Sequence, residues 1–321
     1  MHPTFSFDRF LLLLIGLILG GQFVTTSQRK IPSTSTPKTG NIHPTSHNRL
    51  SVPRNLCHNP CLSSEKIDRD LENKAAQMIQ KKRYTPMKKL LSQMTRKRYR
   101  VPLQKTPITP TPDIASLYRK RLPSMLILGS VFQCDDCTKW HVSGASGFVL
   151  TAQGIAVTNR HVVLDPHAET LFAATAEGGF YPVTEILATD EASDIAIVRL
   201  DAKGLTPLSL AQKAPVGTPV RVISNPDSHY FYLSEGIVSG YYDSPTETPE
   251  ETPTLRMTIT ADYAKGSSGA PILDQHGHVI GMVKSTDSVY YHEHHGHQKD
   301  LQMVFRQCVP VDQIRALIQA P

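Results

Sequence analysis

The spacing of hydrophobic positions changes at about Leu122. Beyond it, apolar residues form short runs separated by Gly, Pro, Asn, Asp and Ser, the residues typical of turns. Many short runs at this spacing are typical of an all-β sandwich or barrel. A helical pattern follows over residues 310–319, where proline is tolerated in the first turn. The predicted strands cover residues 125–132, 147–150, 155–158, 183–187, 195–200, 220–223, 236–241, 255–260, 271–273, 279–283 and 301–305.

Residues 28–121 have a different pattern. One amphipathic helix is predicted over about residues 64–82, where Ile67, Leu71, Ala75 and Met78 recur at helical spacing. Residues 31–60 contain few apolar side chains, which predicts disorder. Prolines between 102 and 112 predict a stiff spacer. We therefore expect a Pro- and Thr-rich arm over residues 28–121, followed by a folded domain over residues 122–321.

The first 27 residues have the pattern of a targeting segment. Arg9 precedes an apolar run over residues 10–19, which is about half the length that spans a bilayer. A secretory signal is the first interpretation. If the apolar run extends to Val24, an uncleaved anchor is the alternative. Both predict a secreted, periplasmic or cell-envelope-associated protein.

Three short motifs carry candidate chemistry. Ser268 lies in Gly-Ser-Ser-Gly-Ala-Pro (266–271), His161 in Thr-Asn-Arg-His (158–161), and Asp194 in Ser-Asp-Ile-Ala (193–196). A serine hydroxyl becomes a useful nucleophile when a general base accepts its proton and a third group orients that base. The three residues occur in the order His, Asp, Ser, which is the order of the chymotrypsin-type double barrel.

In these motifs the chain resembles the trypsin-like serine peptidases, and in particular the bacterial Deg/HtrA-type branch. The resemblance covers about residue 122 to the C-terminus and implies two six-stranded antiparallel β-barrels with a C-terminal helix. It implies a serine endopeptidase that acts on proteins or peptides through an acyl-enzyme, with His161, Asp194 and Ser268 as the triad. The backbone N–H groups of Gly266 and Ser268 would form the oxyanion hole. No cofactor and no catalytic metal are expected, and no PDZ domain is expected after the terminal helix. The alternative is a binding or adhesion module of the same fold with little or no proteolytic activity.

Asp262 suggests cleavage after Lys or Arg. It lies six residues before Ser268, where trypsin-branch enzymes place the carboxylate that binds these side chains. Lys284 is expected on the opposite wall of this pocket, where it would partly neutralise that carboxylate. Cleavage after small or medium apolar residues is the alternative. Ser267 replaces the aspartate of digestive-type members, which argues against activation by a newly cleaved N-terminus.

The sequence contains a group of cysteines, for which two interpretations are open, and a His-rich run. Cys57, Cys61, Cys134 and Cys137 could form disulfides, which we expect in an exported protein, or a zinc site; Cys308 is the fifth cysteine. The His-rich run over residues 292–297 is expected in an exposed loop without bound metal.

Charge is divided unevenly along the chain. Residues 28–121 carry 21 Lys and Arg against 5 Asp and Glu, and residues 122–321 carry 12 against 22. The basic arm could contact an anionic cell-envelope surface. A nucleic-acid partner is not expected, because an exported peptidase seldom meets one.

Overall fold

The structure is a computed structural model that describes residues 63–103, 106, 110–134, 137–244, 253–294 and 297–318, without the side chains of 293, 294 and 297. These residues lie within one compact unit, Cys57–Pro321. The predicted targeting segment and the stretch 31–60 lie outside the described residues. Among the described helices, none is long and apolar enough to cross a membrane.

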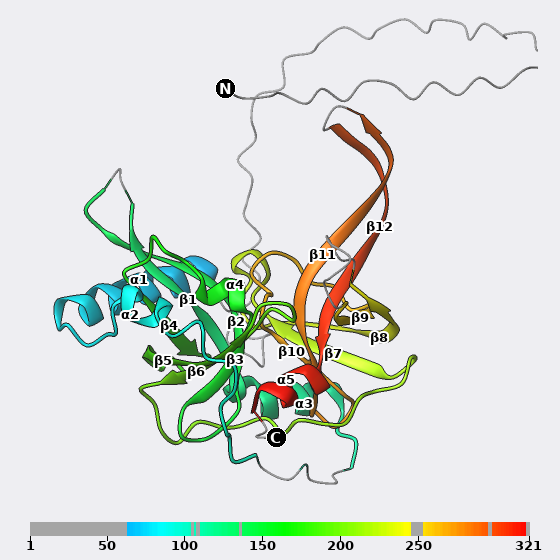
Figure 1. Cartoon of the computed structure of the whole chain (residues 1–321), viewed down its shortest axis with the longest axis horizontal. Coiled ribbons are helices and arrows are strands. Elements are labelled where there is room, and N and C mark those ends of the chain that lie inside the picture. The colour runs from blue at the N-terminus through cyan, green and yellow to red at the C-terminus, as the bar shows by residue number, and fades with distance from the viewer. Residues whose placement is uncertain are drawn as a thin grey trace, which may run out of the picture. The chain divides into compact units, whose positions relative to one another are not determined.

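Two closed barrels of six antiparallel strands form the body of the molecule (Figure 1), which confirms the predicted fold class. In the first barrel the strand order is β1-β2-β3-β6-β5-β4, and in the second it is β10-β11-β12-β9-β8-β7. The C-terminal helix α5 (Val311–Ile318) follows the last strand, as predicted. The strands are β1 (Met125–Gln133), β2 (Trp140–Val149), β3 (Ile155–Thr158), β4 (Thr170–Thr175), β5 (Phe180–Asp190), β6 (Ile195–Leu200), β7 (Pro219–Ser224), β8 (Tyr232–Asp243), β9 (Leu255–Ile259), β10 (Pro271–Leu273), β11 (Val279–His294) and β12 (His297–Pro310).

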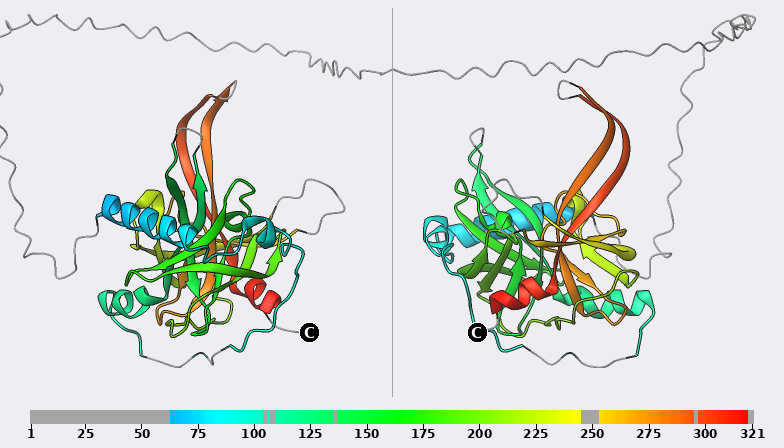
Figure 2. Two further views of the ribbon diagram at one scale, coloured as in Figure 1. Left: turned by 90° about the vertical axis from the view of Figure 1, so that its left-hand side faces the viewer. Right: turned by 45° about the vertical axis from the view of Figure 1, so that its right-hand side comes forward.

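Several strand predictions were incomplete. Strand β4 was not predicted, because its centre contains two alanines, which have low strand propensity. The prediction of β2 began only at Gly147, because the residues directly before it, 143–146, are all small. The loop expected around the His-rich run is instead the far end of a long β11–β12 hairpin, which projects from the second barrel (Figures 1 and 2).

Strand β1 is buried on both faces over its first seven residues. Leu126 and Leu128 belong to the core that fills the first barrel. Met125 and Ile127, on the other face, pack in a second core that also contains residues from the helices before the barrel. A strand without polar alternation therefore requires a cover on its outer face, and the preceding segment provides that cover.

The described residues before β1 form three α-helices, where the sequence predicted one. Helix α1 (Ser64–Gln80) is capped by Ser63, whose hydroxyl accepts from the Lys66 backbone N–H. Helices α2 (Met87–Leu91) and α3 (Ile114–Arg121) follow, and a 3-10 turn, η2 (Leu122–Ser124), leads into β1. We propose that the folded domain begins before α1 rather than at residue 122, because the buried residues of these helices join the barrel cores.

Candidate active site

His161 and Asp194 are brought together by the pairing of β3 with β6. His161 lies in the short helix α4 (Arg160–Val163) directly after β3, and Asp194 directly precedes β6. His161 Nδ1 lies 2.8 Å from Asp194 Oδ2, and the His161 backbone N–H donates to Oδ1 at 3.0 Å. The Asp194 side chain is 13% exposed and that of His161 is 51% exposed. The carboxylate therefore lies on the inner side of an accessible imidazole.

The backbone of Asp194 is held in the left-handed region, with φ 59°. Non-glycine residues adopt this conformation at a cost and persist there when surrounding contacts fix them. The Asp194 carbonyl accepts from the Asn159 side-chain amide at 2.8 Å and from the Arg160 N–H at 3.2 Å. These bonds fix the carboxylate relative to the helix that carries His161.

Ser268 lies in the turn before β10, and β2 of the first barrel braces this turn. The Ser146 N–H donates to the Ser268 carbonyl at 2.9 Å, and the Ser146 hydroxyl donates to the Gly266 carbonyl, also at 2.9 Å. Gly269 has φ +87°, and a Cβ there would lie 2.2 Å from the Ser146 carbonyl oxygen. Glycine is thus required at position 269, where the turn of the second barrel packs against β2.

A cleft of about 620 Å³ connects His161 with Ser268, whereas Asp194 does not line it. His161, Ser268 and Gly266 all line it, together with residues of β1 and β2. Within the described part of the chain, the Ser268 hydroxyl donates to the Lys284 carbonyl at 3.4 Å, and no hydrogen bond joins it to His161. Nucleophile–base contacts are often loose without substrate.

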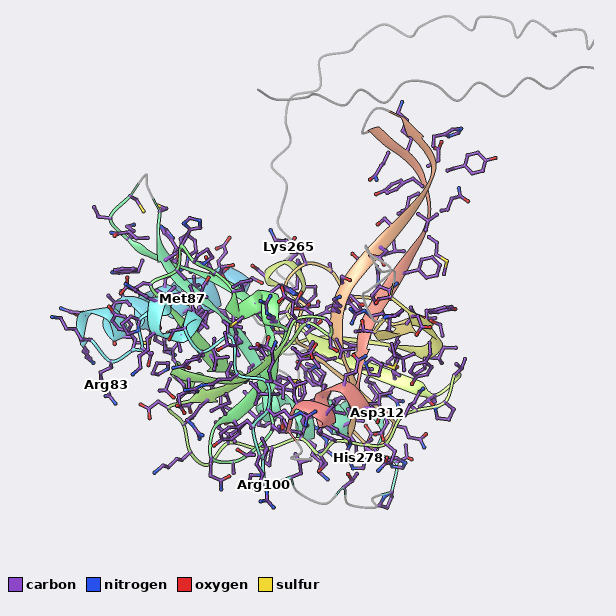
Figure 3. All side chains as sticks on the ribbon, viewed as in Figure 1. Arg83, Met87, Arg100, Lys265, His278 and Asp312 are labelled. Atoms are coloured by element: carbon purple, nitrogen blue, oxygen red, sulfur yellow. The ribbon has the colours of Figure 1, made fainter. Side chains whose placement is uncertain are left out.

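The peptide between Lys265 and Gly266 has a defined orientation. The carbonyl of Lys265 (labelled in Figure 3) accepts from the Asp227 N–H at 2.7 Å, and Gly266 has φ +92°. Because none of the described peptide bonds is cis, the Gly266 N–H points away from Asp227. Among the described residues, the N–H groups of Gly266 and Ser268 have no protein acceptor. Two donors are thus available on the turn that carries the candidate nucleophile.

Asn225 is a residue of this site that sequence reasoning missed. Its side-chain amide lies within hydrogen-bonding distance of the carbonyls of Leu126 and Ala145, and its oxygen accepts from the Phe231 N–H. These bonds close the loop that contains Asp227, the partner of the Lys265 carbonyl. An Asn-Pro pair predicts a turn, but the sequence contains no signal for contacts so distant along the chain.

Helix α1 contacts the same loop. The Ser64 hydroxyl donates to the Ser228 carbonyl at 2.6 Å, and the Tyr230 hydroxyl donates to the Asp68 carboxylate. Asp227 and Ser228 both have positive φ, at 47° and 61°. A strained loop beside the candidate oxyanion hole is therefore held from the side of α1.

The residues predicted for the specificity pocket are not brought together. The Asp262 carboxylate accepts from Arg306 at 2.9 Å, and its side chain is 81% exposed. The next residue, Tyr263, is buried, with its hydroxyl close to the carbonyls of Ser285 and Gln307. Burial lowers the pKa of Lys284, and the positive charge of the nearby Arg256 lowers this pKa further. Neither Asp262 nor Lys284 lines the cleft.

The other singled-out residues lie outside the cleft. Ser267 is fully buried and donates to the Ser224 hydroxyl at 3.0 Å. Cys134 and Cys137 are free thiols, so the expected disulfide is not formed between them, and Cys57 and Cys61 lie outside the described residues. In the hairpin, His292 lies 3.0 Å from Asp300.

The family model of the trypsin-like peptidase domain matches residues 145–282, a range that includes all three candidate residues. A protein of Pseudomonas fluorescens named "Probable periplasmic serine endoprotease DegP-like" is 30% identical over 139 residues, covering 43% of this chain and 28% of that protein. "Serine protease HTRA1" of Xenopus laevis is 30% identical over 144 residues, covering 44% and 31%. "Protease Do-like 1, chloroplastic" of Arabidopsis thaliana is 29% identical over 177 residues, covering 52% and 39%.

The chain spans less than a third of the length of the first two of these relatives. Among solved structures, that of Deg5 covers 63% of this chain and 90% of its own, with a TM-score of 0.47 and 22% identity.

Proposed function

We propose that this chain, whose residues 145–282 match the model of the trypsin-like peptidase domain, is a serine endopeptidase that hydrolyses proteins or peptides through an acyl-enzyme. The observation that carries the proposal is the 2.8 Å contact between His161 Nδ1 and Asp194 Oδ2. His161 also lines a cleft that Ser268 lines. Two of the relatives named above, which are serine proteases by name, support the same chemistry.

In the proposed reaction, the Ser268 hydroxyl attacks the scissile carbonyl while His161 accepts its proton through Nε2. Asp194 accepts a hydrogen bond from Nδ1, which fixes the tautomer and stabilises the imidazolium. His161 then donates the proton to the leaving amine. Water hydrolyses the acyl-enzyme by the same sequence of proton transfers and restores the Ser268 hydroxyl.

The backbone N–H groups of Gly266 and Ser268 are proposed as the oxyanion hole. The support is that both are free of protein acceptors among the described residues, and that the Asp227 contact holds the Lys265 carbonyl on the opposite side of the peptide. Donors that are fixed before the reaction stabilise the oxyanion without reorganisation, and removing one costs about 10²–10³-fold in kcat in such enzymes.

A fluorophosphonate probe tests the proposal directly, because it phosphonylates an activated serine. We expect stoichiometric labelling of the wild-type chain at Ser268, as located by peptide mass spectrometry, and no labelling of Ser268→Ala. Ser267→Ala is the matched control: it removes the adjacent buried hydroxyl and should still be labelled. A folded wild-type chain that neither reacts with the probe nor cleaves a denatured protein favours the alternative, a binding module of the same fold.

For specificity we propose cleavage after small or medium apolar residues. The support is that the Asp262 carboxylate pairs with Arg306 at the surface, while the Tyr263 side chain fills the space between Ser285 and Gln307. A peptide-library profile measures this preference. A dominant preference for Lys or Arg, lost in Asp262→Asn, would contradict it.

We also propose export, with the basic arm as a contact to an anionic envelope surface. The support is the apolar run over residues 10–19 and the excess of basic residues over 28–121. Cell fractionation and N-terminal sequencing of the mature protein test export, and release from membranes by salt tests the surface contact.

A further inference from the structure

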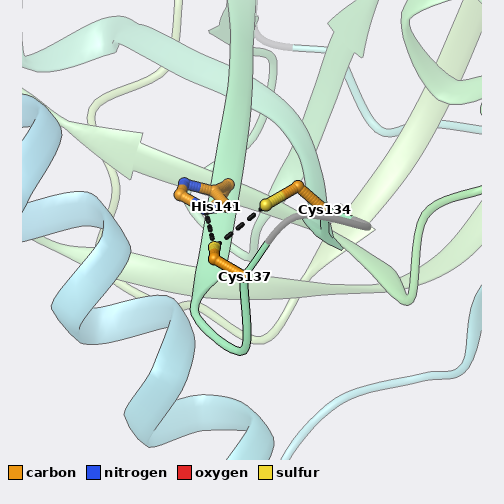
Figure 4. A group of neighbouring side chains, drawn as sticks. All are labelled: Cys134, Cys137 and His141. Carbon is orange, nitrogen blue, oxygen red and sulfur yellow. Dashed lines mark hydrogen bonds between the residues drawn. The ribbon is translucent and has the colours of Figure 1, made fainter.

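A group of metal-ligating side chains lies at the tip of the β1–β2 hairpin, outside the candidate triad. Cys134 directly follows β1, Cys137 lies in the turn, and His141 is the second residue of β2. Figure 4 shows the three side chains turned toward one another. Their ligand atoms all lie within 4.8 Å of one another.

The distances inside the group place three soft or borderline donors around one point. Cys137 Sγ lies 2.9 Å from Cys134 Sγ and 3.1 Å from His141 Nε2. All three residues are partly exposed, so an ion from solvent has access. The sequence spacing, Cys-x-x-Cys followed by His four residues later, keeps all three donors within one hairpin.

A fourth residue orients the imidazole. Glu72, in helix α1, lies 2.9 Å from His141 Nδ1. An ionised carboxylate can only accept a hydrogen bond, so Nδ1 carries the proton and Nε2 presents its lone pair to the thiols. A carboxylate that accepts from the remote nitrogen of a ligating histidine is the recurrent outer shell of metal sites.

We propose that Cys134, Cys137 and His141 bind one zinc ion, with Glu72 orienting the imidazole. Two thiolates and an imidazole are the donor set that zinc prefers, whereas magnesium and calcium prefer oxygen ligands. On binding, the two thiols lose their protons to solvent. With three protein ligands, the fourth position of the tetrahedron would be open to a water molecule.

The geometry requires only a local adjustment. Two sulfurs on a tetrahedral zinc with bonds of about 2.3 Å lie about 3.8 Å apart, so the thiols would separate by about 1 Å. The competing chemistry is oxidation to a Cys134–Cys137 disulfide, which would remove both thiolates and leave His141 without a metal to bind.

The site adjoins the substrate cleft through the strands that carry it. Phe132 pairs with His141 across β1 and β2, with ring centroids 5.9 Å apart. Phe132 and Val142 both line the cleft. A bound ion would thus join the hairpin tip to α1 through His141 and Glu72, and stiffen one wall of the cleft.

The test uses the full chain, reduced, stripped of metal with a chelator and then titrated with zinc alone against a chromophoric chelator. We expect one zinc per chain at the tightest site. Alkylation with iodoacetamide, read by peptide mass spectrometry, should modify Cys134 and Cys137 in the stripped protein and leave them protected after zinc is added. Neither readout depends on peptidase activity.

Variants assign the ligands. We expect zinc to bind at least about 100-fold more weakly to the double variant C134S/C137S, and about 10–100-fold more weakly to Glu72→Gln, the range found for outer-shell partners. His292→Gln is the matched control, since it removes an exposed histidine of the β11–β12 hairpin that also pairs with a carboxylate. Its affinity should equal that of the wild type. Circular dichroism of each stripped variant separates loss of binding from loss of folding.

Two results would overturn the site: a reduced wild-type chain that takes up no zinc, or uptake of one equivalent that survives in folded C134S/C137S. Unchanged affinity in Glu72→Gln would overturn the role of Glu72.

Discussion

The candidate triad differs from a set of ordinary polar residues in how Asp194 is held. Its side chain accepts from both Nδ1 and the backbone N–H of His161, and its own backbone is fixed in a left-handed conformation. A surface aspartate needs none of these constraints. The arrangement restricts the imidazole to one orientation, which is the property a general base requires.

Replacing Ser268 or His161 by alanine should each lower kcat/KM for a peptide substrate by roughly 10⁴-fold or more, and the double variant should be little worse than either single one. Triad members act as a unit, because the base has no function without the nucleophile. Steady-state cleavage of a fluorogenic peptide measures all three variants. Turnover within about tenfold of wild type in either single variant would remove that residue from the mechanism.

His278, labelled in Figure 3, is a buried residue outside the proposed mechanism. Burial lowers its pKa, and the positive charges of Arg121 and His276 act in the same direction, while Asp274 opposes them. The folded chain therefore holds this histidine neutral at pH values where the unfolded chain, with an ordinary pKa of about 6.5, is protonated.

The unfolded state binds more protons, so the contribution of His278 is complete above about pH 6.5 and is lost as pH falls toward the lower pKa of the folded state. We expect the denaturation midpoint of the wild type to fall between pH 7 and pH 5 more steeply than that of His278→Asn. His167→Asn, a change at an exposed histidine, is the control and should keep the wild-type slope. Parallel slopes for wild type and His278→Asn would contradict the prediction.

At the scale of elements, the turn that carries Ser268 depends on close approach to β2. At Gly269 an added Cβ would lie 2.3 Å from Thr158 Oγ1 as well as against the Ser146 carbonyl. Gly204 also has positive φ, at +73°, but nothing lies within 4 Å of its Cβ position. The two glycines therefore separate the cost of backbone conformation from the cost of crowding.

We expect Gly204→Ala to lower the free energy of unfolding by about 1–2 kcal/mol, the cost of a left-handed alanine. Gly269→Ala should lower it by about 2–5 kcal/mol, since overpacking adds about 1–3 kcal/mol. The Gly269→Ala substitution should also reduce kcat, because the backbone shift that relieves the crowding displaces Ser268 from β2. Urea denaturation and peptide cleavage measure the two effects, and equal losses of stability in the two variants would refute the crowding argument.

Elements were predictable where the residue pattern is local. Strands rich in Val and Ile, such as β3 and β6, match their predicted ranges, while β4 was missed because alanine gives no strand signal. His161, Asp194 and Ser268 were found because each lies in a short motif. Asn225 and Ser146 were not found, because they act through contacts with residues far away in sequence. The chain position of Asp262 could be found by counting back from Ser268. The direction of its side chain could not be predicted, because it depends on the burial of the neighbouring Tyr263.

For the whole molecule, the segment before β1 is part of the fold. Leu71, Ala75 and Met78 of α1 are buried in the core that also holds residues of both barrels. Met87 and Leu90 of α2 pack in the core of the first barrel. The excess positive charge of this segment could also hold it against the acidic domain by electrostatic attraction, whereas its buried contacts are apolar.

Apolar and electrostatic attachment predict different responses to salt. Burying a large apolar side chain contributes about 1.5–3 kcal/mol, so Leu71, Met78, Met87, Leu90 and Val101 together contribute about 8–15 kcal/mol. That sum is comparable to the whole stability of an ordinary domain, about 5–15 kcal/mol. A chain shortened to begin at Ile114 should therefore fail to fold stably. Added salt should not change the difference in stability between the shortened chain and the full chain.

Point variants test the same prediction without truncation. Leu71→Ala should lower the free energy of unfolding by about 2–5 kcal/mol, equally at about 0.05 M and 0.5 M NaCl. The controls Arg83→Glu and Lys97→Glu reverse exposed charges of the same segment and should each change it by less than about 0.5 kcal/mol. Exposed charges are screened beyond roughly 10 Å at 0.1 M salt, so an attachment held by charge would weaken over this range. If the charge reversals destabilise the chain more than Leu71→Ala does, and only at low salt, the segment is held by electrostatic attraction rather than by its apolar face.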